Sequence, residues 1–113
     1  FENMDRYANF GLNREKLIDI AAFEEGKSYL GLYNLIGNAE EWVNDFYATY
    51  PTDTLTSPTG PQEGVYKQKR GGSWYRHDNN MPFSAYRYNT NYQYTCYFDI
   101  GFRICLNMQS IEK

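Results

Sequence analysis

The sequence predicts one small domain of the α+β class, with short antiparallel strands, long loops and little regular secondary structure. A length of 113 residues suffices for one core. No segment carries the long apolar stripe of a surface helix. Aromatic residues make up 19% of the chain and include twelve Tyr, which excludes a disordered chain. We therefore expect a core that relies on aromatic rings, whose polar tips lie at hydrogen-bonded edges or on an exposed binding surface.

The first half of the chain predicts few regular elements. The apolar run Leu17–Phe23 is long enough for a strand or a buried turn. Residues 38–50 begin with acidic side chains and then place large apolar ones at helical spacing, while their aromatic content fits a strand nearly as well. Helix and strand therefore both remain open for this segment. Residues 51–64 contain three prolines and two glycines, which predict a surface loop.

The second half predicts two strands separated by loops. Val65–Trp74 alternates well enough for a strand, interrupted at Gly71-Gly72 by a bulge or a close approach of two backbones. Residues 75–99 contain almost no aliphatic side chains and predict loops. Strand character returns in Ile100–Leu106.

Charge and length exclude several classes of protein. The net charge is −3 and no basic stripe runs along the chain, so we expect no nucleic-acid partner. No apolar run approaches the roughly 18 residues that a membrane span needs. The chain begins at Phe1, inside ordinary domain sequence, which predicts a piece of a longer protein. Cys96 and Cys105 could form a disulfide or stay free, so the compartment remains open, with an extracytoplasmic or secreted location favoured.

Several glycine- and aromatic-rich phrases recur in a defined order. They are Tyr7–Phe10, Gly31–Trp42, Gly60–Gly64, Arg70–Trp74, Ser84–Arg87 and Gly101–Arg103. Their order and spacing resemble the formylglycine-generating enzyme (sulfatase-modifying factor) family. The resemblance covers residues 7–106 and implies a C-type-lectin-like fold. It also implies that residues 1–113 form a single domain equivalent to the C-terminal portion of the family domain, which a missing N-terminal half-domain or a partner chain would complete.

The resemblance implies a structural calcium ion at the turn within Gly31–Trp42. Its ligands would be the side chains of Asn34 and Glu41 and the carbonyls of Gly37 and Ala39. The chemistry agrees, because calcium takes carboxylate, amide and backbone oxygens. Glu40 stands where the family usually has an aromatic residue, and it adds a negative charge nearby. The alternative is a turn with a surface glutamate and no ion.

The resemblance argues against catalysis. The family's enzymes oxidise a cysteine with copper held by two cysteines, and those positions are Arg76 and Met81 here. Copper(I) prefers thiolates, so copper is not expected. Ser73 and His77 match residues of the family's substrate pocket, but a histidine alone is more often a solvated loop residue.

A surface rich in Tyr and Asn stands where that chemistry would be. Tyr gives contact area at low entropic cost, and Asn gives adaptable hydrogen bonds, as in antibody loops. We predict a protein or glycan ligand for this surface; the alternative is that these residues only fill an aliphatic-poor core. The predicted ligand-binding residues are Trp74, Tyr75, Arg76, His77, Asn79, Tyr86, Tyr88, Asn91, Tyr92, Tyr94 and Tyr97.

Three functions follow. The favoured one is a non-catalytic binding domain with a structural calcium. The first alternative is a retroelement-diversified ligand-binding protein, since some such proteins use this fold and vary residues between the phrases Arg70–Trp74 and Gly101–Arg103. The residues present fit the codon changes of that process, except Met81 and Gln93. The second alternative is an oxidoreductase of the formylglycine-generating type, acting on cysteine in sulfatases.

Overall fold

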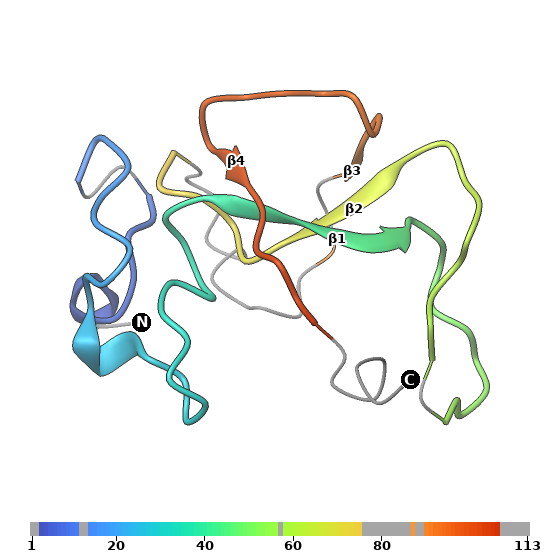
Figure 1. The fold of residues 1–113 in the computed structure, drawn as a ribbon, viewed down its shortest axis with the longest axis horizontal. Helices are drawn as coiled ribbons and strands as arrows, with labels where there is room; N and C mark the ends of the chain where they lie inside the picture. Colours follow the sequence, from blue (N-terminus) through green and yellow to red (C-terminus); the bar gives the residue numbers. More distant parts are fainter. Residues whose placement is uncertain (1–2, 12–13, 57, 76–86, 88–89, 107–113) are drawn as a thin grey trace.

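The computed structural model describes residues 3–11, 14–56, 58–75, 87 and 90–106 (Figure 1). In these segments the regular elements are two 3-10 helices and four strands. They are η1 (Met4–Arg6), η2 (Glu24–Gly26), β1 (Glu40–Phe46), β2 (Lys67–Arg70), β3 (Thr90–Asn91) and β4 (Ile100–Gly101). Long loops connect them, as the sequence predicts.

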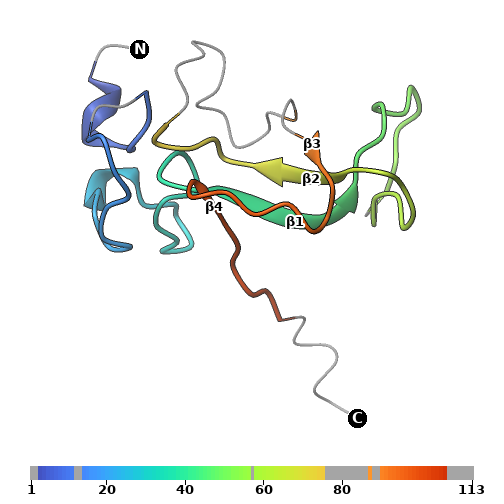
Figure 2. The ribbon, with the colours of Figure 1, turned by 90° about the horizontal axis from the view of Figure 1, so that it is seen from above.

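The strands form one sheet in the order β3-β2-β1-β4. β1 and β2 are antiparallel, with Glu41 opposite Arg70 and Phe46 opposite Lys67. β3 is antiparallel to β2, whereas β4 runs parallel to β1, so the sheet is mixed rather than purely antiparallel. The N-terminal segment lies at one end of the sheet and the loop between β1 and β2 at the other (Figures 1 and 2). The segment that follows β4 leads away from the sheet (Figure 2).

The structure decides several of the predicted elements. Residues 38–50 contain a strand, β1, and the helix alternative is wrong. The strand predicted over Val65–Trp74 is shorter, since β2 ends at Arg70, immediately before two glycines with φ of 89° and 71°. These glycines therefore end the strand instead of interrupting it. Of Ile100–Leu106, only the first two residues form a strand. The described part of residues 51–64 has no regular element, as predicted.

Of the alternatives predicted for Leu17–Phe23, the strand is wrong, and the turn is present but not buried. The segment forms a turn at Ile20 and Ala21. It is not buried, because Leu17 is 47% and Ile20 is 81% exposed. The segment is held by polar contacts, in which the Ile18 backbone binds a distant asparagine side chain instead of a neighbouring strand.

The described core is polar rather than aromatic. The largest fully buried side chains are Lys69, Gln68, Glu40, Asn9 and Ser73, and Ala8 is the one buried hydrophobic residue among the described residues. The buried charges are paired, because Lys69 Nζ lies 2.7 Å from Glu40 Oε2. Ser73 Oγ donates a 2.7 Å hydrogen bond to Asp99 Oδ2. Burial of the charges in these two pairs is tolerated because each charge finds a partner.

Asn38 connects three distant segments. Its backbone adopts φ of 61°, and its side chain is buried. The side-chain oxygen accepts hydrogen bonds from Ile18 N at 3.0 Å and Asn9 Nδ2 at 3.2 Å, and the side-chain nitrogen donates to Ile18 O at 3.3 Å. Its backbone N–H donates to Asn9 O at 2.6 Å, and its carbonyl accepts from Trp74 N at 3.0 Å. The N-terminal segment, the turn before β1 and the loop after β2 are thereby joined.

Gly37 and Gly31 offer a matched test of this junction. Both have positive φ, 74° and 80°, but an added Cβ at Gly37 would overlap the Asn9 carbonyl, whereas one at Gly31 meets nothing within 4 Å. We expect Gly31→Ala to cost about 1 kcal/mol, from backbone strain alone. Gly37→Ala adds the steric overlap and should cost at least about 3 kcal/mol or prevent folding. Urea unfolding measures both, and equal losses would contradict the close approach.

The buried ion pair supplies a second test. Lys69→Met leaves the Glu40 carboxylate buried without its 2.7 Å partner, and we expect a loss of about 3–5 kcal/mol in the free energy of unfolding. The double variant Lys69→Met/Glu40→Leu removes both charges and should lose less than the single variant. Thermal and urea unfolding of both variants provide the measurement. Losses that add across the two sites would show that the charges are not coupled.

Candidate functional site

Two buried ties anchor the ends of the segment between Trp74 and Ile100. The Ser73 hydroxyl binds the Asp99 carboxylate at 2.7 Å, and Glu40 N donates to Asp99 O at 2.9 Å. The loop after β2 and the start of β4 are therefore fixed to each other and to the start of β1. Side chains next to these ties are presented from a rigid base.

The first exposed group at this base is the Trp74 cluster, formed by Trp74, Tyr75 and Phe98. The Trp74 and Tyr75 ring centroids lie 5.5 Å apart, and Phe98 lies 5.8 Å from Trp74 and 5.0 Å from Tyr75. These are favourable aromatic distances. Tyr75 is 48% and Phe98 is 60% exposed. The Trp74 indole N–H is buried and has no hydrogen-bond partner among the described residues.

The second group is the tyrosine row, formed by Tyr66, Tyr92 and Tyr94. The rings of Tyr66 and Tyr92 lie 5.0 Å apart, and those of Tyr92 and Tyr94 are stacked at 5.6 Å with planes 5° apart. A hydrogen bond with Tyr92 raises the pKa of Tyr66, with smaller contributions from charge and burial. Tyr94 is 79% exposed. The row thus offers ring faces and hydroxyl groups on the surface.

The structure places six of the predicted ligand-binding residues. Trp74 and Tyr75 belong to the Trp74 cluster, and Tyr92 and Tyr94 to the tyrosine row. Asn91 lies in β3 opposite Lys67. Tyr97 is 51% exposed, and its carbonyl accepts a hydrogen bond from Ile100 N. The remaining predicted residues lie outside the described residues, as does the second copper position; they are Arg76, His77, Asn79, Tyr86, Tyr88 and Met81.

Two members of these clusters were missed by the sequence reasoning. Tyr66 directly precedes β2, outside the tyrosine-rich segment 75–99, whereas Phe98 lies inside that segment, directly before the buried Asp99. A weak signal existed in each case, because Tyr66 lies in the predicted strand Val65–Trp74 and Phe98 in the tyrosine-rich segment 75–99.

The two free thiols, Cys96 and Cys105, are both exposed.

The predicted calcium ligands lie around one turn. Asn34, Ala39 and Glu41 line a cavity of about 440 Å³, whereas Gly37 does not and instead donates its N–H to Gly71 O at 2.8 Å. Asn34 Nδ2 donates to Ile20 O at 3.0 Å. The Asn34 side-chain oxygen is buried and has no partner among the described residues. Such an unused acceptor beside a carboxylate and a backbone carbonyl fits the donor set of calcium.

Arg103 shares this cavity. Its guanidinium binds both carboxylate oxygens of Glu41 and donates to the carbonyls of Tyr33 at 3.1 Å and Asn34 at 3.4 Å. The hydrogen bond that Arg103 donates to Glu41 raises the pKa of Arg103, and burial opposes this shift. A calcium ion would have to share the Glu41 carboxylate with this guanidinium. The Glu40 carboxylate is buried on Lys69, so it adds no free charge to the turn.

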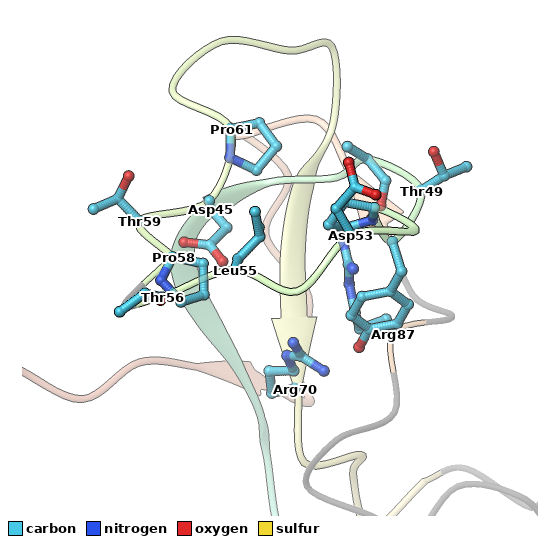
Figure 3. Close-up of a pocket in the computed structure, with 14 residues that line it drawn as sticks. Asp45, Thr49, Asp53, Leu55, Thr56, Pro58, Thr59, Pro61, Arg70 and Arg87 are labelled. Carbon is cyan, nitrogen blue, oxygen red and sulfur yellow. The ribbon is translucent and has the colours of Figure 1, made fainter.

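The largest of the described cavities is separate from all three sites. About 830 Å³ lies between the loop that connects β1 to β2 and the side chains of Arg70 and Arg87 (Figure 3). Among the described residues, no three His, Cys, Asp or Glu side chains converge as a metal cluster would require. No described helix has the length and hydropathy to cross a membrane.

Together these features define a loop-rich, C-type-lectin-like domain with an exposed aromatic surface. The model of the sulfatase-modifying factor enzyme 1-like domain matches residues 3–108, and the chain belongs to this family.

Relatives of known sequence support this assignment. The chain is 37% identical over 87 residues to the serine/threonine-protein kinase Pkn1 of Chlamydia trachomatis, and the aligned region covers 65% of this chain and 14% of that protein. It is 42% identical over 48 residues to the formylglycine-generating enzyme of Bos taurus, and this aligned region covers 42% of this chain and 13% of the enzyme. The chain therefore spans about a seventh of the length of these relatives.

A solved structure supports the fold. Treponema denticola variable protein 1 superposes with a TM-score of 0.72 at 28% identity, covering 88% of this chain and 35% of that one. The C-type-lectin-like fold that the sequence predicts is confirmed by this likeness and by the family match.

Proposed function

We propose that this chain is a non-catalytic ligand-binding domain whose described contact surface is formed by the Trp74 cluster and the tyrosine row. The observation that carries the proposal is the exposure of two groups of contacting rings, of which the Trp74 cluster adjoins the buried tie of Ser73 to Asp99. Exposed apolar ring surface is unfavourable in water, and a ligand that covers the rings removes this cost. Rings held on a fixed base also lose less conformational entropy on binding. Such a surface suits a protein or a glycan partner.

The likeness to a variable protein supports the first alternative, a diversified binding protein. That neighbour is similar over 88% of this chain. Both aromatic clusters hold residues from the segment between Arg70–Trp74 and Gly101–Arg103, where diversification would act. The flanking DNA decides this point: a reverse-transcriptase gene and an adenine-rich near-copy of codons 70–105 would support diversification, and their absence would contradict it.

We do not assign the enzymatic functions of these relatives to this chain. Arg76 and Met81 occupy the two copper-cysteine positions, and neither supplies a thiolate. The chlamydial kinase shares only 14% of its length with this chain. We further propose that the domain corresponds to the C-terminal portion of the family domain and is completed by an N-terminal half-domain or a partner chain.

Binding can be tested with variants of the aromatic surface. The immobilised domain is used to select ligands from a glycan array and from a displayed peptide library. We expect Tyr92→Ser and Phe98→Ser to weaken the selected ligand at least about tenfold, as truncation of an aromatic anchor does. Tyr29→Ser serves as the control, because Tyr29 is 96% exposed and belongs to neither cluster. Affinities are measured by biolayer interferometry.

Two outcomes would contradict the proposal. A ligand that binds both surface variants as tightly as the parent chain would place the contact surface elsewhere. Stoichiometric copper binding together with turnover of a cysteine peptide would favour the oxidoreductase instead.

We also propose that the Asn34–Glu41 turn holds a structural calcium ion. Its support is the unused Asn34 oxygen beside the Glu41 carboxylate. Chelation should lower the melting temperature by several degrees, since roughly 1–2 kcal/mol of linked binding energy is lost. Glu41→Gln should abolish most of this chelator-induced shift, because the site loses its charge. Differential scanning fluorimetry measures the shift with and without calcium.

The readout separates calcium from the ion pair with Arg103. Glu41→Gln weakens that pair and lowers the melting temperature in any buffer, but only bound calcium makes the shift depend on chelator. Glu25→Gln is the matched control, because Glu25 forms an exposed ion pair with Arg6 away from the turn. A melting temperature of the parent chain that is insensitive to chelator would refute the site.

A further inference from the structure

The loop between β1 and β2 encloses a cavity that belongs to neither aromatic cluster nor the calcium turn. Its volume of about 830 Å³ lies in the range of small-molecule sites. Arg70 enters it from the end of β2, and Arg87 from a distant part of the chain. In Figure 3 the two arginines lie on the side of the cavity away from Pro61 and Thr59.

Arg87 is held in place before any ligand arrives. Its guanidinium carbon lies 4.1 Å from the ring centroid of Tyr50 and 5.6 Å from that of Tyr47. Its Nη2 donates to Ala48 O at 2.7 Å. Its Nε is buried and has no hydrogen-bond partner among the described residues. The group is therefore fixed by stacking while part of its donor edge stays unused.

Arg70 and Arg87 converge on the hydroxyl of Tyr50. Burial raises the pKa of this hydroxyl, but hydrogen bonding and charge from the two guanidiniums lower it more, so the pKa lies below its ordinary value. A phenol that accepts hydrogen bonds from two cations keeps its own O–H to donate. Arg70, Arg87 and the Tyr50 hydroxyl thus lie close together at one side of the cavity.

Two carboxylates complete the walls. Asp45 comes from β1 and Asp53 from the loop, and the described residues place neither in an ion pair. These negative charges oppose the entry of a multiply charged anion such as phosphate. They also accept hydrogen bonds from hydroxyl groups. The cavity therefore favours a ligand with a single negative charge and several hydroxyls.

We propose that this cavity binds a hydroxylated carboxylate of the size of a sugar acid, with its carboxylate between Arg70 and Arg87 and its hydroxyls toward Asp45 and Asp53. A planar carboxylate matches the fork of a guanidinium, which supplies two parallel donors. The proposal extends beyond the aromatic surface and does not depend on it, because the two share no residue.

The test uses D-glucuronate as the probe and NMR of the ¹⁵N-labelled chain as the measurement. We expect saturable shifts of the Tyr50 amide and of the Arg87 Nε–H signal, which Arg87→Lys assigns by its loss. The dissociation constant should be on the order of 1 mM for a ligand this small. Glucose, which lacks the carboxylate, and inorganic phosphate should each bind at least about tenfold more weakly.

Two variants and one control make the result specific. Arg70→Gln and Arg87→Lys should each weaken glucuronate at least about tenfold, since each removes a charge-assisted or forked contact. Arg6→Gln should leave the affinity unchanged, because Arg6 forms an exposed ion pair with Glu25. The N-terminal segment to which it belongs lies at the opposite end of the sheet from the loop (Figure 1). The amide spectrum outside the loop reports whether each variant is folded.

Three results would contradict this proposal. Absence of saturable shifts up to 50-fold above the expected constant of about 1 mM would refute the site. Equal binding of glucose or phosphate would refute carboxylate selectivity. Retained affinity in both arginine variants would place the glucuronate elsewhere. None of these outcomes bears on the aromatic surface, whose variants are tested separately.

Discussion

The hydrogen bonds of Asn38 are the constraint on which the rest of the structure depends. One residue with φ of 61° joins Asn9, Ile18 and Trp74 through its backbone and side chain. An asparagine suits the position because its short side chain tolerates the left-handed conformation and offers both a donor and an acceptor. The turn before β1 and the start of the Trp74 cluster lie directly beside this junction, so the geometry of both depends on it.

A polar core has a consequence for the aromatic residues. In the described part of the chain, ion pairs and hydrogen bonds occupy the interior, as Lys69 with Glu40 and Ser73 with Asp99 illustrate. Buried polar groups specify one arrangement because alternatives leave them unpaired. Tyrosines are then not needed for burial, and Tyr66, Tyr75, Tyr92 and Tyr94 stand exposed in the two clusters, where they can meet a ligand.

The sequence predicts the parts of this structure that local chemistry determines. The glycines Gly31, Gly37, Gly60, Gly71 and Gly72 of the recurring phrases adopt positive φ, a conformation that depends mainly on the residue itself. The Lys69–Glu40 pair could not be predicted, since its members are 29 positions apart and charged residues are expected outside. Apolar content alone does not determine burial, as the exposed Leu17 and Ile20 of the run Leu17–Phe23 show. Tyr66, Phe98 and the Arg70–Arg87 cavity depend on tertiary contacts between segments far apart in the chain.

The separation of scaffold from surface bears on how this domain could change its ligand. Substitution of an exposed ring such as Tyr94 typically alters the free energy of unfolding by about 0.5 kcal/mol or less. Loss of a buried tie such as that of Ser73 to Asp99 costs roughly 1–3 kcal/mol, a large share of the stability of a small domain. A chain built in this way can exchange contact residues without losing its fold.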